Sequence, residues 1–239
     1  NIINDVAPAK AAQITPIAEL HVDANGDNEP DLKGETRTIE GIITSGNNNP
    51  LTSFFDVVYV QDETGGITIH PIANTKLKLG QKVRITGVVG SYEGDTQLGE
   101  VQELTDVEII DESINLVDPT KLSTADSMLE KYEGLLVSAQ GVVKSIDTQA
   151  GNIIINDGSG DARVHINGYI GGGQSGEEVG AWANRIKVGD TLSVIGLAAE
   201  DAAGKRIRVR NTDEVIVVEA STETPDNGGT TTPDNGGTT

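Results

Sequence analysis

Short stretches in which apolar and polar residues alternate recur along the chain, separated by turns that contain glycine. Residues 38–44 read Thr-Ile-Glu-Gly-Ile-Ile-Thr, so Ile39, Gly41 and Ile43 share one face. A period of two indicates a strand with one buried face. A glycine inside such a strand indicates a bulge or a sharp coil, which a small barrel needs in order to close. The pattern predicts an all-β fold of short strands.

Four segments of the first half recur in the same order in the second half. Residues 38–44 match 137–143, residues 60–67 match 155–162, residues 79–88 match 188–197, and residues 105–110 match 212–217. Chance alignment of all four in one order is improbable, so the chain contains an internal repeat. The matched turns at 62–66 and 157–160 pair aspartate with glycine, as hairpin turns do.

Five strands closed by glycine kinks describe the OB barrel. We therefore predict an all-β chain made of two tandem five-stranded OB-type barrels with short connecting helices. The predicted parts are an N-terminal segment over 1–33 with a helical turn and a calcium loop, a first barrel over 34–112, a helical linker over 113–131, a second barrel over 132–219 and a low-complexity tail over 220–239.

Three connecting segments have helical signals. Thr15 and Pro16 predict a helical turn over 16–20, with Thr15 as the N-cap. Residues 123–132 have the pattern of a capped amphipathic helix. Residues 177–186 begin with two acids and continue with apolar residues at helical spacing, which predicts a helix between the third and fourth strands of the second barrel.

The end of the chain repeats Thr-Pro-Asp-Asn-Gly-Gly-Thr-Thr twice, over 224–231 and 232–239. Such a composition does not bury a core, so it predicts a linker or stalk, with O-glycosylation as one option.

Composition narrows the functional classes. The 239 residues include 37 acids and 17 bases, for a net charge of −20. Such a charge repels nucleic acid and anionic lipid, and favours solubility and divalent cations. The chain has no cysteine, which excludes disulfides, thiolate metal sites and cysteine nucleophiles. Its apolar runs are too short for a membrane helix, so we expect no membrane span.

Several segments resemble the OB-fold modules of secreted bacterial nucleases and nucleotidases. They are residues 16–20, 23–31, 40–44, 59–67, 78–87 and 133–141, so the resemblance spans roughly residues 15–219. It implies an extracellular or cell-surface location and a role in binding substrate or the cell surface beside a catalytic phosphohydrolase domain. Since this chain contains no such domain, the resemblance does not imply hydrolase activity here.

Four side chains with oxygen atoms lie before the first predicted strand: three at every second position, Asp23, Asn25 and Asp27, and a fourth further on, Asp31. Oxygen ligands at such spacing can wrap a calcium ion. The segment departs from an EF-hand loop, because Asn28 occupies the sixth position and Gly34 the twelfth. Two interpretations stay open: a site for one Ca²⁺, or a polar, solvated connection.

A basic stripe and an aromatic pair are the candidate ligand-binding residues. Residues 205–210 read Lys-Arg-Ile-Arg-Val-Arg, which places Arg206, Arg208 and Arg210 on one face of a strand. These arginines either hold a phosphate or acidic glycan, or pair with acids on neighbouring strands. Phe54 and Phe55 fall in the loop between the first two strands, where they either contact a ligand or plug the barrel end.

The sequence gives little support for a catalytic function. The three histidines show no metal-ligand spacing, and the chain has no nucleophile elbow or phosphate loop. We expect no enzyme activity. OB barrels often bind nucleic acid through aromatics in a basic groove, but both predicted barrels carry net negative charge.

Three functions remain. The first is a non-catalytic extracellular protein that serves as a binding or spacer module of the cell surface. The alternative is a structural subunit that self-assembles into an extracellular fibre or surface layer, a homo-oligomer joined through edge strands or extended termini. The third is a nucleic-acid-binding accessory module of a secreted nuclease. Polysaccharide and nucleic acid are the candidate ligands.

Overall fold

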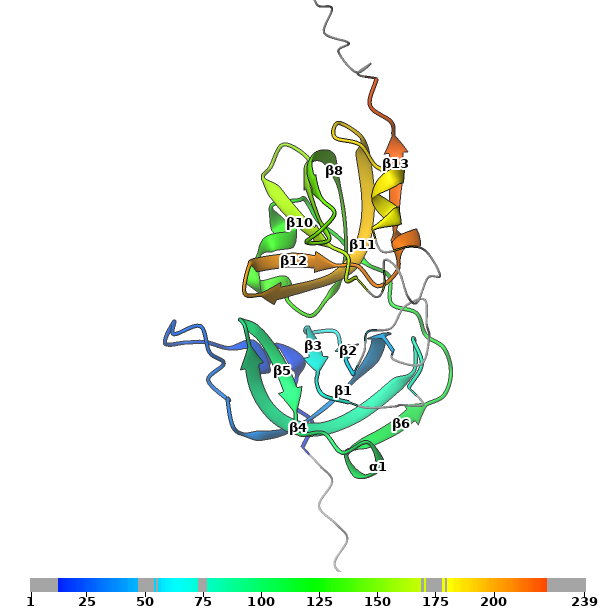
Figure 1. Ribbon diagram of the computed structural model, residues 1–239. Helices are drawn as coiled ribbons and strands as arrows, with labels where there is room; N and C mark the ends of the chain where they lie inside the picture. Colours follow the sequence, from blue (N-terminus) through cyan, green and yellow to red (C-terminus); the bar gives the residue numbers. More distant parts are fainter. Residues whose placement is uncertain are drawn as a thin grey trace, which may run out of the picture.

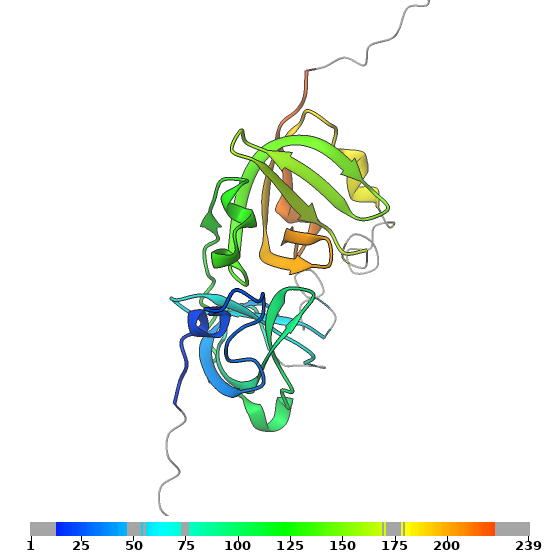
Figure 2. The same cartoon turned by 90° about the vertical axis from the view of Figure 1, so that its left-hand side faces the viewer.

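The computed structural model describes residues 13–46, 54, 56–72, 77–168, 170, 178 and 180–222. These residues form two small β-barrels stacked one above the other, as two perpendicular views show (Figure 1 and Figure 2). The described chain enters at the far end of the first barrel and leaves at the far end of the second (Figure 1). None of the helices in this part of the chain is long and apolar enough to cross a membrane.

The first barrel has the OB strand order. Its strands are β1 (Thr36–Ser45), β2 (Val58–Gln61), β3 (Gly66–Ile69), β4 (Lys82–Tyr92), β5 (Asp95–Gly99) and β6 (Val107–Asp111), with the short helix α1 (Glu103–Asp106) before β6. They lie in the order β1-β2-β3-β5-β4-β6, and β1 also pairs with β4 to close the barrel. β3 and β5 are parallel, whereas the other neighbours are antiparallel.

The second barrel repeats this arrangement. Its strands are β8 (Leu136–Asp147), β9 (Asn152–Asn156), β10 (Asp161–His165), β11 (Thr191–Asp201), β12 (Gly204–Arg208) and β13 (Val215–Glu219), and the short β7 (Thr120–Lys121) precedes them. β8 pairs with β11 to close the barrel, and β10 runs parallel to β12. The predicted fold class, two tandem OB-type barrels, is confirmed by this strand order.

Matched glycines allow the first strand of each barrel to coil tightly. A Cβ added to Gly41 would lie 2.7 Å from the carbonyl oxygen of Gln61, and one added to Gly141 would lie 2.8 Å from the backbone nitrogen of Asn156. The pairing register shifts a few residues later, between 43 and 45 in β1 and between 143 and 145 in β8. The glycine thus permits the close approach, and the bulge follows it.

The segment before each barrel docks on a turn aspartate. In the first copy, the carboxylate of Asp62 accepts a hydrogen bond from the backbone N–H of Ile17 (3.0 Å). In the second copy, Asp157 accepts one from the backbone N–H of Thr124 (3.1 Å). Both aspartates sit in the turn that follows the second strand of their barrel, so the structural repeat extends upstream of the strands.

The connecting helices differ from those predicted. The first is a 3-10 turn, η1 (Ile17–His21), and Thr15 does not cap it, because the acceptor is Asp62. The predicted helix over 123–132 is wrong. Two 3-10 turns, η2 (Asp126–Met128) and η3 (Glu130–Tyr132), stand there instead, separated by extended backbone at Leu129.

The other connections are equally short. The helix predicted over 177–186 is reduced to the 3-10 turn η4 (Ala181–Arg185), while residues 177 and 179 lie outside the described residues. A last 3-10 turn, η5 (Thr212–Glu214), precedes β13. Residues 223–239 of the tail also lie outside the described part, so the stalk stays a prediction.

Side chains of the first barrel complete the core of the second. Phe54 and Tyr59 are fully buried, and they belong to the same apolar cluster as Leu136, Ile153 and Val194. The first barrel keeps a separate core, which includes Ile39, Val60, Ile67, Val83 and Leu98. The two barrels are therefore packed against each other through apolar contacts as well as polar ones.

Buried polar groups also form hydrogen bonds across the interface between the two barrels, which is called the joint below. Glu133, 4% exposed, accepts hydrogen bonds from the backbone N–H of Thr96 (2.7 Å) and from Lys205 Nζ (2.8 Å). Asp95 accepts from Thr68 Oγ1 (2.8 Å) and from the backbone N–H of Glu200 (3.3 Å). Burial, followed by the charge of Glu133, raises the pKa of Asp95 to about 7. Burial likewise raises the pKa of Glu133.

Candidate ligand-binding cleft between the barrels

A cleft of about 330 Å³ lies between the two barrels. The first barrel lines it with the β1–β2 loop, strands β3 and β5, and the β4–β5 turn. The second barrel lines it with β12 and the end of β11. OB barrels bind oligonucleotides and oligosaccharides on the face of their second and third strands, between the β1–β2 and β4–β5 loops. The cleft occupies this position on the first barrel, and the second barrel forms its opposite wall.

The cleft combines an exposed ring with unsatisfied polar groups. The Tyr92 side chain, at the end of β4, is 63% exposed. Across from it, Asn167 Oδ1 and Arg206 Nε are buried and have no hydrogen-bond partner within the described residues. Buried polar groups normally find a partner, so these two atoms mark positions where a ligand or a water would bond. Gln97 adds a side-chain amide to the same cleft.

Two of the three predicted stripe arginines line this cleft. Arg206 Nη1 forms an ion pair with Asp201 Oδ2 (2.7 Å). The Arg208 guanidinium carbon lies 3.9 Å from the centroid of the Phe54 ring, and Arg208 Nη1 lies within hydrogen-bond distance of the Tyr59 hydroxyl (3.2 Å). Burial, followed by the neighbouring charge of Arg208, lowers the pKa of Arg206.

The third arginine of the stripe, Arg210, links the second barrel to the first. Arg210, 8% exposed, donates from Nη1 to the carbonyl oxygen of Thr44 (2.5 Å) and forms an ion pair with Glu214. Phe54 is 1% exposed and forms part of the core beneath Arg208, whereas Phe55 lies outside the described residues. The stripe therefore faces the first barrel, and carboxylates balance much of its charge.

The charge of the cleft is net negative. Its carboxylates include Asp56, Glu93, Glu200 and Asp201, against the two arginines. Burial would raise the pKa of Asp201, but its hydrogen bond with Arg163 and the charge of Arg206 outweigh burial and lower it, so this group stays ionised. A polyanion would meet repulsion here, whereas a neutral ligand would meet many hydrogen-bonding groups.

The four predicted calcium ligands lie in one exposed loop. Asp23 accepts hydrogen bonds from the backbone N–H groups of Gly26 (2.7 Å) and Asn28 (2.9 Å). Both carboxylate oxygens of Asp31 lie 3.2 Å from the backbone nitrogen of Ala24. The Asn25 side-chain oxygen accepts from the backbone N–H of Asp27 (2.8 Å). These bonds fold the loop on itself, and the binding of calcium stays a prediction.

A second cluster of potential ligands was not evident in the sequence. Among the described residues, one group of three brings ligand atoms within 4.8 Å of one another: His21, Glu130 and Glu133. The Lys205 ammonium forms ion pairs with both glutamates and with Glu200. Burial lowers the pKa of Lys205, but these carboxylates more than offset it, so the net shift is upward. An ammonium group therefore already fills the acidic part of this cluster.

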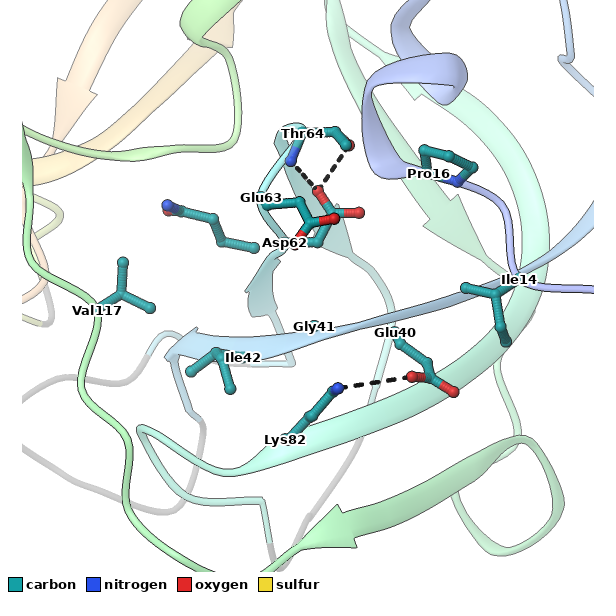
Figure 3. A pocket seen from close by; sticks show the side chains of 11 residues that line it. Ile14, Pro16, Glu40, Gly41, Ile42, Asp62, Glu63, Thr64, Lys82 and Val117 are labelled. Atoms are coloured by element: carbon teal, nitrogen blue, oxygen red, sulfur yellow. Dashed lines mark hydrogen bonds and ion pairs between the residues drawn. The ribbon is translucent and has the colours of Figure 1, made fainter.

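Each barrel also has a groove beside its first strand, and Figure 3 shows the groove of the first barrel. The first groove, of about 480 Å³, has Glu40, Gly41 and Ile42 as its floor, with Ile14 and the 62–64 turn at its sides. The second, of about 640 Å³, has the matched residues Gln140, Gly141 and Val142 as its floor. The grooves are repeat-related, since Gly41 and Gly141 occupy equivalent positions.

No protein-family model matches the chain, and no curated protein matches it either. Among solved structures, it is similar to the hypothetical protein ygiW from E. coli, at 13% identity and a TM-score of 0.30, over 42% of this chain and 94% of that one. It is also similar to tetrameric p202 HIN2, at 16% identity and a TM-score of 0.36, over 77% of this chain and 95% of that one.

A third similar structure is a replication protein A heterotrimer bound to ssDNA, at 11% identity and a TM-score of 0.28. The match covers 79% of this chain and 50% of that one. At these values the similarities say nothing about the ligand of this chain. Its OB architecture is established by the strand order and pairing described above.

Proposed function

We propose that this chain is a non-catalytic, extracellular binding module of the cell surface that holds a neutral polysaccharide in the cleft between its barrels. The observation that carries the proposal is the cleft itself, with an exposed tyrosine on one barrel and unsatisfied buried polar atoms on the other. Its volume is at the lower end of the range for ligand pockets, about 300 to 1,000 Å³.

The chemistry of the cleft suits a sugar ring. A tyrosine offers an apolar ring face together with a polar hydroxyl, and the C–H face of a pyranose can pack on such a ring. Carboxylates accept hydrogen bonds from sugar hydroxyls, and side-chain amides both accept and donate them. Gln97 and Asn167 supply the amides. Arg206 Nε is a donor and Asn167 Oδ1 an acceptor, and neither has a partner among the described residues, so both are available to the same ligand.

The charge distribution favours a neutral ligand over nucleic acid. The chain carries a net charge of −20, and the arginines of the stripe are largely engaged by Asp201, Glu214 and the aromatic pair Phe54 and Tyr59. Single-stranded nucleic acid needs a basic groove along its backbone. Nucleic acid is therefore the competing ligand in the test below.

The extracellular placement rests on the acidic composition, the low-complexity tail and the resemblance to modules of secreted enzymes. Calcium belongs to the same proposal. A Ca²⁺ ion held by Asp23, Asn25, Asp27 and Asp31 would fix the segment that precedes the first barrel.

The test is affinity electrophoresis through gels that contain neutral polysaccharides, with single-stranded DNA as a separate probe at the same salt concentration. We expect a neutral polysaccharide to retard the protein. Tyr92→Ala should weaken binding by about tenfold, equivalent to about 1.4 kcal/mol, while Tyr92→Phe keeps the ring and should retain it. Leu116→Ala is the matched control, because this side chain is also exposed (66%) but lies outside the cleft.

Two results would contradict the proposal. One is retardation by single-stranded DNA alone, which would assign the cleft to nucleic acid. The other is equal loss of polysaccharide binding in Tyr92→Ala and Leu116→Ala, which would place the binding outside the cleft.

A second candidate function, a structural subunit of a fibre or surface layer, rests on the outer edges of the barrels. β6 and β13 each end their sheet, and Ile110, Ile216 and Val218 on these strands are 39%, 53% and 50% exposed. Unpaired edges with apolar side chains favour pairing between copies. Electron microscopy of the purified protein tests this function: we expect ordered fibres or sheets that Ile216→Lys abolishes, and dispersed single particles would contradict it.

A further inference from the structure

Two Asn-Gly pairs occur among the described residues, one in the loop of residues 23–31 and one beside the cleft. They are Asn25–Gly26 and Asn167–Gly168. Because glycine has no Cβ, its backbone nitrogen can approach the Cγ atom of the preceding asparagine, which is how such pairs lose the side-chain amide. The two pairs have the same covalent structure, so a difference in their reactivity must come from the fold around each.

Hydrogen bonds hold the reacting groups of the first pair. Asn25 Oδ1 accepts from the backbone N–H of Asp27 (2.8 Å), and Asn25 Nδ2 donates to Asp27 Oδ2 (3.1 Å). The backbone N–H of Gly26 donates to Asp23 Oδ1 (2.7 Å). The side-chain amide and the nitrogen that would attack it are therefore each bonded to another group of the loop, and these bonds must break before the two can meet.

The second pair lacks these restraints. Asn167 Oδ1 has no hydrogen-bond partner within the described part of the chain. In the same part of the chain, the backbone N–H of Gly168 donates no hydrogen bond. Gly168 is exposed, and a Cβ built on it would meet nothing within 4 Å. The backbone at Gly168 thus has room to move toward the side chain of Asn167, and water can reach it.

We propose that Asn167–Gly168 is a site of spontaneous deamidation that turns an amide of the cleft into a carboxylate. The Gly168 nitrogen attacks Cγ of Asn167 and loses its proton, the Cγ–Nδ2 bond breaks, and ammonia leaves. Water then opens the resulting five-membered succinimide at Cγ, which gives aspartate, or at the backbone carbonyl carbon, which gives isoaspartate. One water is consumed and one ammonia released, so the solvent supplies the only co-reactant.

The modification changes the cleft, because Asn167 is part of its lining. An amide that both donates and accepts hydrogen bonds becomes a carboxylate that only accepts them. The new negative charge joins a cleft whose carboxylates already outnumber its arginines. Isoaspartate also lengthens the backbone by one carbon at this position. A neutral polysaccharide should therefore bind the modified protein more weakly; this consequence rests on the proposed function, whereas the deamidation itself does not.

Exposure and hydrogen bonding make opposite predictions for the two pairs. Asn25 is exposed, whereas Asn167 is half-buried. If access of solvent decided the rate, Asn25 would react first. Since three hydrogen bonds restrain the first pair, we expect Asn167 to react at least about tenfold faster than Asn25. The comparison of the two sites in one protein therefore tests the structural argument directly.

The test incubates the full chain at mildly alkaline pH in water enriched in heavy oxygen, with a chelator that keeps calcium from the loop of residues 23–31. Alkaline pH favours loss of the glycine N–H proton. Digestion with pepsin at acid pH, followed by mass spectrometry, gives the fraction of each asparagine converted over time. Heavy oxygen enters when the succinimide opens, so it marks conversion during the incubation. We expect label at Asn167 long before Asn25.

Three variants examine the cause. Gly168→Ala should slow the reaction at Asn167 by about tenfold or more, because the methyl group hinders the attacking nitrogen while the fold has room for it. Asp23→Ala removes the acceptor of the Gly26 N–H, so it should speed the reaction at Asn25 and leave Asn167 unchanged. Gly90→Ala is the matched control, since a Cβ there also meets nothing within 4 Å, and it should change neither rate.

The proposal is overturned if Asn167 is converted no faster than Asn25, or if Gly168→Ala leaves the rate at Asn167 unchanged. Asn167→Asp tests the consequence separately: it should weaken retardation by a neutral polysaccharide by about tenfold, and unchanged retardation would contradict an effect on the cleft. If Asn167 is converted but no neutral polysaccharide retards the wild-type chain, the deamidation site stands and the proposed function fails.

Discussion

The two barrels share one backbone plan and differ mainly in the face formed by their second and third strands. β2 and β3 of the first barrel are buried on both faces, because the second barrel packs on their outer side. β9 and β10 of the second barrel alternate buried and partly exposed residues. The repeat thus preserved the glycines and turn aspartates that build each barrel, while this one face became a joint in one copy and stayed open in the other.

A single matched position shows the difference. Gly66 begins β3, and a Cβ there would collide with the backbone carbonyl of Gly134 in the second barrel. The matched residue at the start of β10 is Asp161, which is exposed and accepts a hydrogen bond from Asn156 Nδ2 (2.6 Å). The glycine is needed where the barrels touch, and a side chain is tolerated where they do not.

The largest expected effect concerns what the copies share. Gly41→Ala and Gly141→Ala should each lower the free energy of unfolding by about 3 kcal/mol, because each Cβ would meet backbone of the next strand. Gly90→Ala is the control, since a Cβ there meets nothing within 4 Å. Urea unfolding measures all three. A large loss in one copy and none in the other would break the equivalence of the barrels.

The second prediction concerns a matched position at which the two barrels differ. Gly66→Ala should lower the free energy of unfolding by about 2 kcal/mol and weaken the contact between the barrels. Asp161→Ala should change the free energy of unfolding by no more than about 0.5 kcal/mol. Thermal unfolding measures the stability, and limited proteolysis of residues 113–131 reports the joint. Equal costs at the two positions would mean that the barrel contact does not explain the glycine.

One pH effect should come from a buried acid of the first barrel. Asp95 titrates near pH 7 in the folded chain and at its ordinary pKa of 3.8 when unfolded, so the folded state binds more protons between these values. Asp95 should therefore contribute stability that falls as the pH rises from about 4 to about 7, and this contribution should level off above that range. The matched residue of the second barrel is Gly204, which carries no such acid.

Asp95→Asn should remove this contribution and so change the slope of the stability curve between pH 5 and pH 7, while Asp161→Asn, an exposed control, should leave the slope unchanged. Urea midpoints at pH 5, 6, 7 and 8 provide the measurement. If both variants keep the wild-type slope, the burial of Asp95 is not the source of the pH dependence.

The smallest effect tests a loop that only the first copy has. Calcium at about ten times its Kd should stabilise the chain by about 1.4 kcal/mol and raise Tm by about 4 °C. Asp27→Ala should abolish the rise by removing one proposed ligand. Differential scanning calorimetry with and without calcium decides the matter, and an unchanged Tm of the wild-type chain would leave residues 23–31 as a polar connection.

The barrels were predictable from the sequence because their signals are local. Gly41 and Gly141 mark matched strands, and Asp62 and Asp157 mark matched turns, each within a few residues of its pattern. The helix over 123–132 was not predictable to the same degree, because apolar spacing over ten residues fits two 3-10 turns as well as one α-helix.

The cleft could not be derived in the same way. Tyr92 and Asn167 lie in different barrels and become neighbours of one cleft only after the barrels dock. Asp95 follows Gly94 and has the sequence of an ordinary turn aspartate, and its burial depends on the second barrel. The arginine stripe was visible as a pattern, but its partners Asp201 and Tyr59 follow from the tertiary structure.

The central claim is that a ligand lies between the barrels and contacts both. An NMR titration of the full chain with the neutral polysaccharide that retards it most, in short oligomers, tests this claim most directly. We predict that the amide signals of Tyr92 and Gln97 in the first barrel and of Asn167 and Arg206 in the second shift together, with one dissociation constant. Shifts confined to one barrel, or none at these four residues, would contradict it.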